Sequence, residues 1–76
     1  MKELLEYVAR ALVDDPEAVE VTEVEGERSV TLQLTVAPED MGKVIGKRGR
    51  IARALRSLMR AAGTREGVTA QVEIVE

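Results

Sequence analysis

Residues 41–63 read MGKVIGKRGRIARALRSLMRAAG, and at their centre lies the tetrapeptide Gly46-Lys47-Arg48-Gly49. From Met41 to Arg65 the chain has eight basic residues and no acidic one. The rest of the chain holds the other three basic residues and all 14 acidic ones, so the formal net charge of −3 combines about +8 with about −11. Because the local field steers a charged ligand, this segregation predicts an anionic partner for the basic stretch.

The G-x-x-G spacing has two interpretations. Glycines let a phosphodiester approach the backbone closely, and the N-terminus of a following helix offers unpaired N–H groups to phosphate. The alternative is a tight helix–helix turn with solvated charges. Two cationic middle residues and a basic helix after them favour phosphate binding. A nucleotide-hydrolysing P-loop is excluded, because only three residues separate Gly42 from Gly46 and Arg48 stands where Ser or Thr should bind magnesium.

Upstream of this stretch, apolar spacing predicts one helix and two strands. Residues 2–13 have the helical spacing of an amphipathic segment, and Asp14-Asp15-Pro16 ends it. Residues 19–24 are expected to form a short strand and residues 25–27 a turn. Residues 30–36 alternate strictly between apolar and polar side chains, which indicates the clearest strand of the chain. A hairpin follows from this order.

Downstream, the pattern predicts two helices and a last strand. Proline and two acids at residues 38–40 suit the start of a short helix that runs to about Ile45. A second helix is expected over residues 50–62, ended by Gly63, with residues 64–67 as a loop and residues 68–74 as a strand. The order is αββααβ. Strands 30–36 and 68–74 flank two helices, so if they pair they are parallel. The fold class is therefore α+β, with a three-stranded mixed sheet and three helices on one face.

The helix over residues 50–62 divides into two faces on a helical wheel. The apolar face is expected to be core; it holds Ile51, Ala54, Leu55, Leu58, Met59 and Ala62. The other face holds Arg50, Arg53, Arg56 and Arg60, and no acid on this helix pairs with them. A bound polyanion would relieve their mutual repulsion, and so would an acidic protein partner or the chain's own acids.

Composition excludes several function classes. The chain has no Cys and no His, so it lacks disulfides, thiol chemistry, the commonest general base and the commonest metal ligand. We therefore expect no enzyme activity, no cofactor, no metal site and no small-molecule substrate. Its 76 residues predict one domain, 1–76. Charged residues interrupt the N-terminal helix, so we expect no signal peptide, no membrane partner and a cytoplasmic location.

Residues 38–55, PEDMGKVIGKRGRIARAL, resemble the core motif of a KH domain, V-I-G-x-x-G followed by a basic and apolar helix. The αββααβ order resembles the type II, bacterial form of that fold. The resemblance covers essentially the whole chain and is strongest to small bacterial single-KH-domain RNA-binding proteins of the KhpA type. It implies single-stranded RNA as the ligand. Because the motif has no aromatic residue on which bases could stack, we expect low sequence specificity. The resemblance also implies a post-transcriptional role, such as that of an RNA chaperone, in the control of growth and cell shape.

The same resemblance assigns roles to individual residues. The loop that clamps about four nucleotides of RNA backbone would be Gly46, Lys47, Arg48 and Gly49. An apolar floor for bases would be lined or supported by Val44, Ile45, Ile51 and Leu55, although Ile51 and Leu55 can equally belong to the core, and the last strand would form the other wall. Further phosphate contacts would come from Arg50 and Arg53 and then from Lys43, with Arg56 and Arg60 as weaker candidates. Tyr7 is the only aromatic residue and lies on the first helix, so stacking platforms for bases are absent from the motif.

Two partner types beyond RNA remain. The resemblance implies a homodimer, or a heterodimer with a larger KH-domain protein, and multiple copies would raise the affinity of a small module. The competing interpretation from a different class is a protein-interaction module whose arginine face docks an acidic partner.

Overall fold

Three strands form a single sheet in the computed structural model, which describes residues 1–75. They are β1 (Glu20–Gly26), β2 (Ser29–Thr35) and β3 (Thr69–Ile74), in the spatial order β1-β2-β3. β1 pairs antiparallel with β2, and β2 pairs parallel with β3, with Leu32 opposite Val72. The predicted hairpin and the predicted parallel pair are both confirmed. The hairpin turn lies at residues 27–28, slightly later than expected, because Gly26 still pairs with Ser29.

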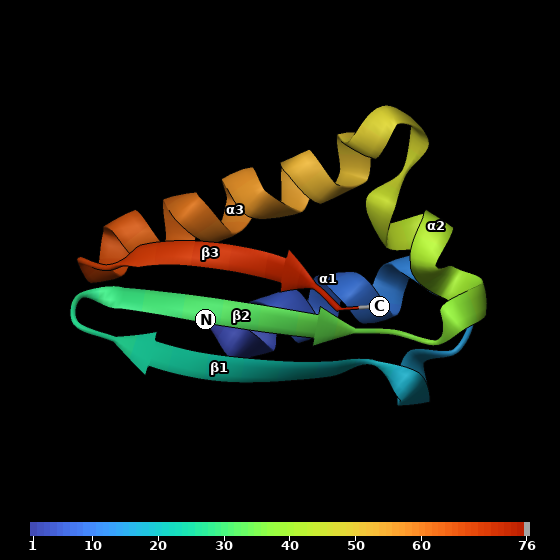
Figure 1. Ribbon diagram of the computed structural model, residues 1–76, viewed down its shortest axis with the longest axis horizontal. Helices are drawn as coiled ribbons and strands as arrows, with labels where there is room; N and C mark the ends of the chain where they lie inside the picture. Colours follow the sequence, from blue (N-terminus) through green and yellow to red (C-terminus); the bar gives the residue numbers. More distant parts are fainter. Residues whose placement is uncertain (76) are drawn as a thin grey trace.

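Three α-helices complete the fold of residues 1–75, and they confirm the αββααβ order. They are α1 (Lys2–Leu12), α2 (Met41–Ile45) and α3 (Arg50–Glu66), with 3₁₀ turns at Pro16–Ala18, Pro38–Asp40 and Lys47–Gly49. In Figure 1, α1 lies behind the sheet, α3 runs along β3, and the short α2 stands at the end of the sheet where β2 leads into it. The connection between α2 and α3 projects beyond the tip of β3.

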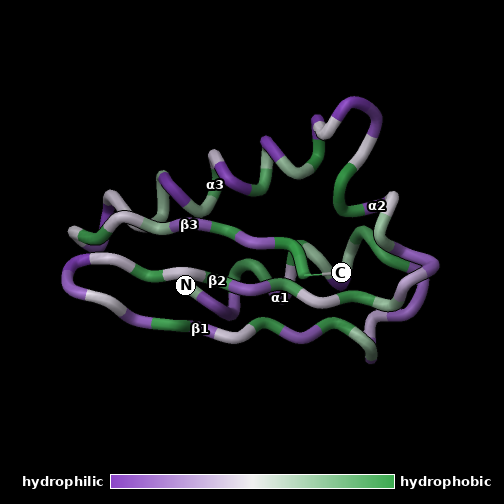
Figure 2. Tube along the Cα trace, viewed as in Figure 1, coloured by the Kyte–Doolittle hydropathy of each residue, from purple (hydrophilic) through white to green (hydrophobic). Residues whose placement is uncertain are grey.

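The core lies between the helices and one face of the sheet. Along β2, Leu32 and Leu34 are fully buried, whereas the residues that precede each of them, Thr31 and Gln33, are partly exposed on the other face. The same alternation along β3 buries Ala70 and Val72. Figure 2 shows this alternation of hydropathy along the strands. Because side chains point to opposite faces of a strand in turn, the helices need to cover only one face of this sheet.

The predicted end of α3 was wrong. The helix continues through Gly63 to Glu66, and Gly67, with φ of 77°, is the residue that ends it. Gly63 is buried, and a Cβ placed on it would lie 2.8 Å from the Val68 carbonyl oxygen and 2.9 Å from Ala70 Cβ. Gly63 is therefore required for the close approach of α3 to β3, and not for a helix end.

The predicted core face of α3 was also wrong in part. The residues of α3 that are buried are Ala52, Leu55, Met59 and Gly63. Ala54 is exposed, and Leu58 keeps 40% of its surface exposed. A helical wheel treats every apolar residue as inward, but the sheet covers only the narrow strip of α3 that contacts it, with small residues at both ends of that strip.

Candidate nucleic-acid interface

The loop at residues 46–49 has an unusual backbone for its length. Gly46, Arg48 and Gly49 have φ angles of 76°, 58° and 72°. The left-handed region suits glycine but costs energy for Arg48, and backbone strain of this kind gathers at functional sites. The Gly49 N–H donates to the Gly46 carbonyl at 3.1 Å, which closes the turn directly before α3 begins at Arg50.

The two glycines of this loop are required for different reasons. A Cβ on Gly46 would lie 2.6 Å from Ile51 Cγ1 and 2.9 Å from the Ile51 backbone nitrogen, so the fold itself leaves no space there. At Gly49 nothing lies within 4 Å of an added Cβ, so only the positive φ requires glycine. The open space beside Gly49 gives a ligand close access to the backbone.

Exposed cations surround the loop. The side chains of Lys47, Arg48, Arg50 and Arg53 are exposed, and none of them forms an ion pair within residues 1–75. The backbone N–H groups of Lys47 and Arg48 donate to no backbone carbonyl of another element in that same part of the chain. Figure 2 shows the loop as a hydrophilic projection. Free cations and free N–H groups at the start of a 17-residue helix form a surface that favours phosphate.

A groove of about 320 Å³ runs between α3 and the edge strand β3. One wall is Arg56 and Arg60, and the other is residues 69–72. Arg56 Nε donates to the carbonyl oxygen of Val72 at 3.5 Å, so this edge carbonyl faces the groove. Sequence reasoning ranked both arginines low because they are one and two turns further from the loop than Arg53. Their position beside β3 depends on how α3 lies against the sheet, and no local pattern reports that.

The apolar residues near the loop divide into two groups. Ile45 keeps 36% of its surface exposed and Ile51 is half-buried, so both can contact a ligand beside the loop. Val44 is fully buried and Leu55 nearly so. These two therefore belong to the core, where they support the loop from below.

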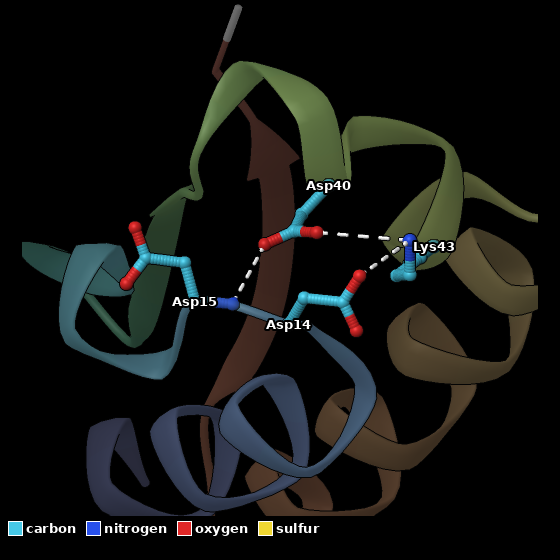
Figure 3. Close-up of polar contacts among 4 residues, drawn as sticks. All are labelled: Asp14, Asp15, Asp40 and Lys43. Atoms are coloured by element: carbon cyan, nitrogen blue, oxygen red, sulfur yellow. Dashed lines mark hydrogen bonds and ion pairs between the residues drawn. The ribbon is translucent and has the colours of Figure 1, made fainter.

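Lys43 differs from the other cations of the predicted site. Its Nζ lies 3.2 Å from Asp14 Oδ2 and 3.7 Å from Asp40 Oδ1 (Figure 3). The hydrogen bond to Asp14 is the main cause that raises the pKa of Lys43 above its ordinary value of 10.5, and Asp40 adds to it. To contact a phosphate, Lys43 would therefore have to break its ion pairs with Asp14 and Asp40.

Neither a metal site nor a membrane span is found in the described chain. Within residues 1–75, no three residues of the types His, Cys, Asp or Glu are grouped so as to hold a metal ion. No helix of that range is long and apolar enough to cross a membrane.

The architecture, with its glycine loop between two helices, is that of a KH domain. The family model described as the KH domain of KhpA/KhpB matches residues 2–74. The chain belongs to this family, which is non-enzymatic.

The sequences of curated relatives match this chain over all or nearly all of their length. The chain is 57% identical to the RNA-binding protein KhpA of Clostridium acetobutylicum, over 99% of this chain and 100% of the relative. It is 49% identical to RNA-binding protein KhpA of Aquifex aeolicus, over 100% of this chain and 96% of that relative. Among solved structures, it resembles a variant of Aquifex aeolicus Era bound to GDP.AlF4-, with a TM-score of 0.65 and 18% identity, over 96% of this chain and 28% of that one. This last likeness concerns the fold alone.

Proposed function

We propose that this protein binds single-stranded RNA, with the loop at residues 46–49 on the phosphate backbone and the groove between α3 and β3 on the bases. The observation that carries the proposal is the pair of exposed cations Lys47 and Arg48, free of ion pairs within residues 1–75 and held between two glycines. Its relatives are named RNA-binding proteins, and KH domains clamp about four nucleotides of backbone with this loop.

The groove suits bases without demanding a particular sequence. Its walls offer guanidinium planes from Arg56 and Arg60 and the backbone carbonyl of Val72. No aromatic side chain lies there, since Tyr7 is the single aromatic residue and lies exposed on α1. Base stacking on an aromatic ring therefore does not contribute, and one copy should bind with modest affinity and low specificity.

We also propose that two copies associate, which would raise affinity through multivalency. An apolar strip, formed by Leu4, Leu58, Ala61 and Ala62, borders a cavity of about 530 Å³ between α1 and α3. Arg65 and Glu66 flank this strip. A two-fold axis through it can bring the Arg65 of each copy close to the Glu66 of the other. The α3 residues of the strip lie in the C-terminal half of that helix, whereas residues 46–49 precede its N-terminus, so both loops would stay free. A larger KH-domain protein is the alternative occupant.

The double variant Lys47→Asp/Arg48→Asp tests RNA binding. Both glycines remain, and Asp tolerates the left-handed backbone of position 48. Two attractive contacts become repulsive, and since each charge-assisted contact is worth about 1.5–3 kcal/mol, affinity for a short unstructured oligoribonucleotide should fall about a hundredfold or more. The control is Lys2→Asp/Arg28→Asp, which reverses two charges outside the basic stretch and should bind nearly as the parent does.

If the loop variant is folded and binds like the control, the proposal is wrong, and the arginine face must be reassigned to an acidic protein partner. Binding to a polyglutamate peptide, measured in parallel, distinguishes that outcome.

A further inference from the structure

The feature that leads beyond the proposed function is a buried carboxylate at the base of α2. Asp40 is only 2% exposed, and it is the buried charged residue of the described chain. A buried carboxylate is costly unless it is partnered. Asp40 Oδ2 accepts a hydrogen bond from the backbone N–H of Asp15 at 3.0 Å, and its Oδ1 lies 3.7 Å from Lys43 Nζ.

These contacts join two distant parts of the chain. Asp14 and Asp15 belong to the connection after α1, whereas Asp40 and Lys43 lie at the start of α2. Lys43 reaches across to Asp14 Oδ2 at 3.2 Å while it stays close to Asp40 (Figure 3). In the same view the Asp15 carboxylate points away from the cluster, so Asp15 contributes only its backbone N–H.

The orientation of α2 depends on such contacts. At five residues, α2 is too short to be stable alone, so tertiary anchors hold it in place. Val44 anchors it to the core on one side, and the ion pairs of Lys43 anchor it on another. Gly46, the first residue of the loop, directly follows α2, and its N–H donates to the Gly42 carbonyl at 2.8 Å. A shift of α2 is therefore passed on to the loop.

We propose that Lys43, held by Asp14 and Asp40, is a positioning residue that orients the loop at residues 46–49, and that it does not contact RNA. The inference rests on the proposed function of that loop. Moving Lys43 to a phosphate would remove an ion-pair partner from the buried Asp40. Lys47 and Arg48 are closer to the proposed phosphate path and form no ion pairs within residues 1–75, so phosphates are neutralised there first.

The two possible roles of Lys43 give opposite signs for Asp14→Asn. If Lys43 were a phosphate ligand restrained by Asp14, the substitution would release it and strengthen RNA binding. If Lys43 positions the loop, the substitution loosens α2 and weakens binding. Asp14 is 81% exposed, so its replacement should leave the protein folded. Asp15→Asn is the matched control, because it removes the same charge from the neighbouring residue and leaves every contact of the cluster intact.

The experiment measures the affinity for an unstructured oligoribonucleotide at several salt concentrations, together with amide hydrogen exchange at Gly46 and Gly49 without RNA. Asp14→Asn should bind about two- to fivefold more weakly than Asp15→Asn, and its loop amides should exchange faster. Lys43→Gln should also weaken binding but leave the salt slope of affinity unchanged.

Two results would overturn the inference: Asp14→Asn binding as tightly as Asp15→Asn or tighter, or Lys43→Gln lowering the salt slope by about 0.7, the value for one lost phosphate contact. The exchange measurement needs no RNA, so it tests the positioning role even if the loop proves not to bind RNA.

Discussion

Gly63 on α3 and Ala70 on β3 lie in direct contact, since a Cβ placed on Gly63 would lie only 2.9 Å from Ala70 Cβ. The backbone of β3 is equally close, with the Ala70 nitrogen at 3.1 Å. This contact sets how near α3 comes to the edge strand, and thus the width of the groove whose walls carry Arg56 and Arg60.

Gly63→Ala should therefore destabilise the protein. The added methyl group meets backbone atoms that cannot move away freely, and overpacking of this kind costs about 1–3 kcal/mol. Gly42→Ala is the control: it is also a helical glycine, but nothing lies within 4 Å of its added Cβ, so stability should hold or rise by up to about 1 kcal/mol. Urea unfolding of both variants checks the prediction, and equal midpoints would contradict it.

Gly49→Ala and Gly67→Ala should separate loop geometry from stability. Both glycines have positive φ, 72° and 77°, and open space around an added Cβ. Each substitution should therefore lower the stability by a similar amount, about 1–2 kcal/mol. Only Gly49 lies in the proposed clamp. We expect Gly49→Ala to lose about tenfold or more in RNA affinity, as for one charge-assisted contact, and Gly67→Ala to bind normally. A parallel loss in both would mean that affinity only follows stability.

The affinity for single-stranded RNA should depend on salt. If the loop and α3 neutralise roughly 3–5 phosphates, log affinity should fall against log salt with a slope of about −2 to −3.5. Lys47→Gln should reduce the steepness by about 0.7, and Arg56→Gln should do the same if the groove carries backbone as well as bases. A slope near zero for the parent would contradict the proposal that the loop clamps phosphates.

Alkaline pH should weaken the fold through Lys43. Its pKa in the folded protein is raised above 10.5, so its ion pairs stabilise the protein below that pH. This contribution is lost as pH rises through the folded pKa, because the neutral amine no longer pairs with Asp14 and Asp40. The melting temperature of the parent should therefore fall more steeply above pH 10.5 than the melting temperature of Lys43→Gln. Parallel declines would show that the ion pairs do not contribute.

Leu58→Glu should abolish self-association without unfolding the protein. Leu58 is 40% exposed, so a charge there leaves the core intact but places two carboxylates on the apolar strip of the proposed dimer. Val24→Glu, at an exposed position on β1, is the control and should leave the molar mass of the protein in solution the same as that of the parent. Light scattering after gel filtration measures both. If the Leu58→Glu protein still associates, the interface between the copies does not include this apolar strip.

Local pattern determined most of the fold. The alternation over residues 30–36 and 68–74 predicted β2 and β3, because a period of two identifies a half-buried strand without knowledge of its neighbours. The two helices between these strands then required a parallel pairing, which the structure confirms. The loop at residues 46–49 was likewise visible in the sequence, since glycine spacing and charge segregation are both local properties.

Tertiary structure decided the properties that depend on a neighbour. From the sequence alone, either Gly63 or Gly67 could end α3. In the structure Gly63 lies against β3, and Gly67 is the residue that ends the helix. Leu58 fits the predicted core face, yet 40% of its surface stays exposed in the folded protein. Lys43 belongs to the basic stretch by sequence, but the fold brings Asp14 within 3.2 Å of its Nζ. Sequence fixes which groups are present and their local periodicity, whereas the partner of each group depends on packing between segments far apart along the chain.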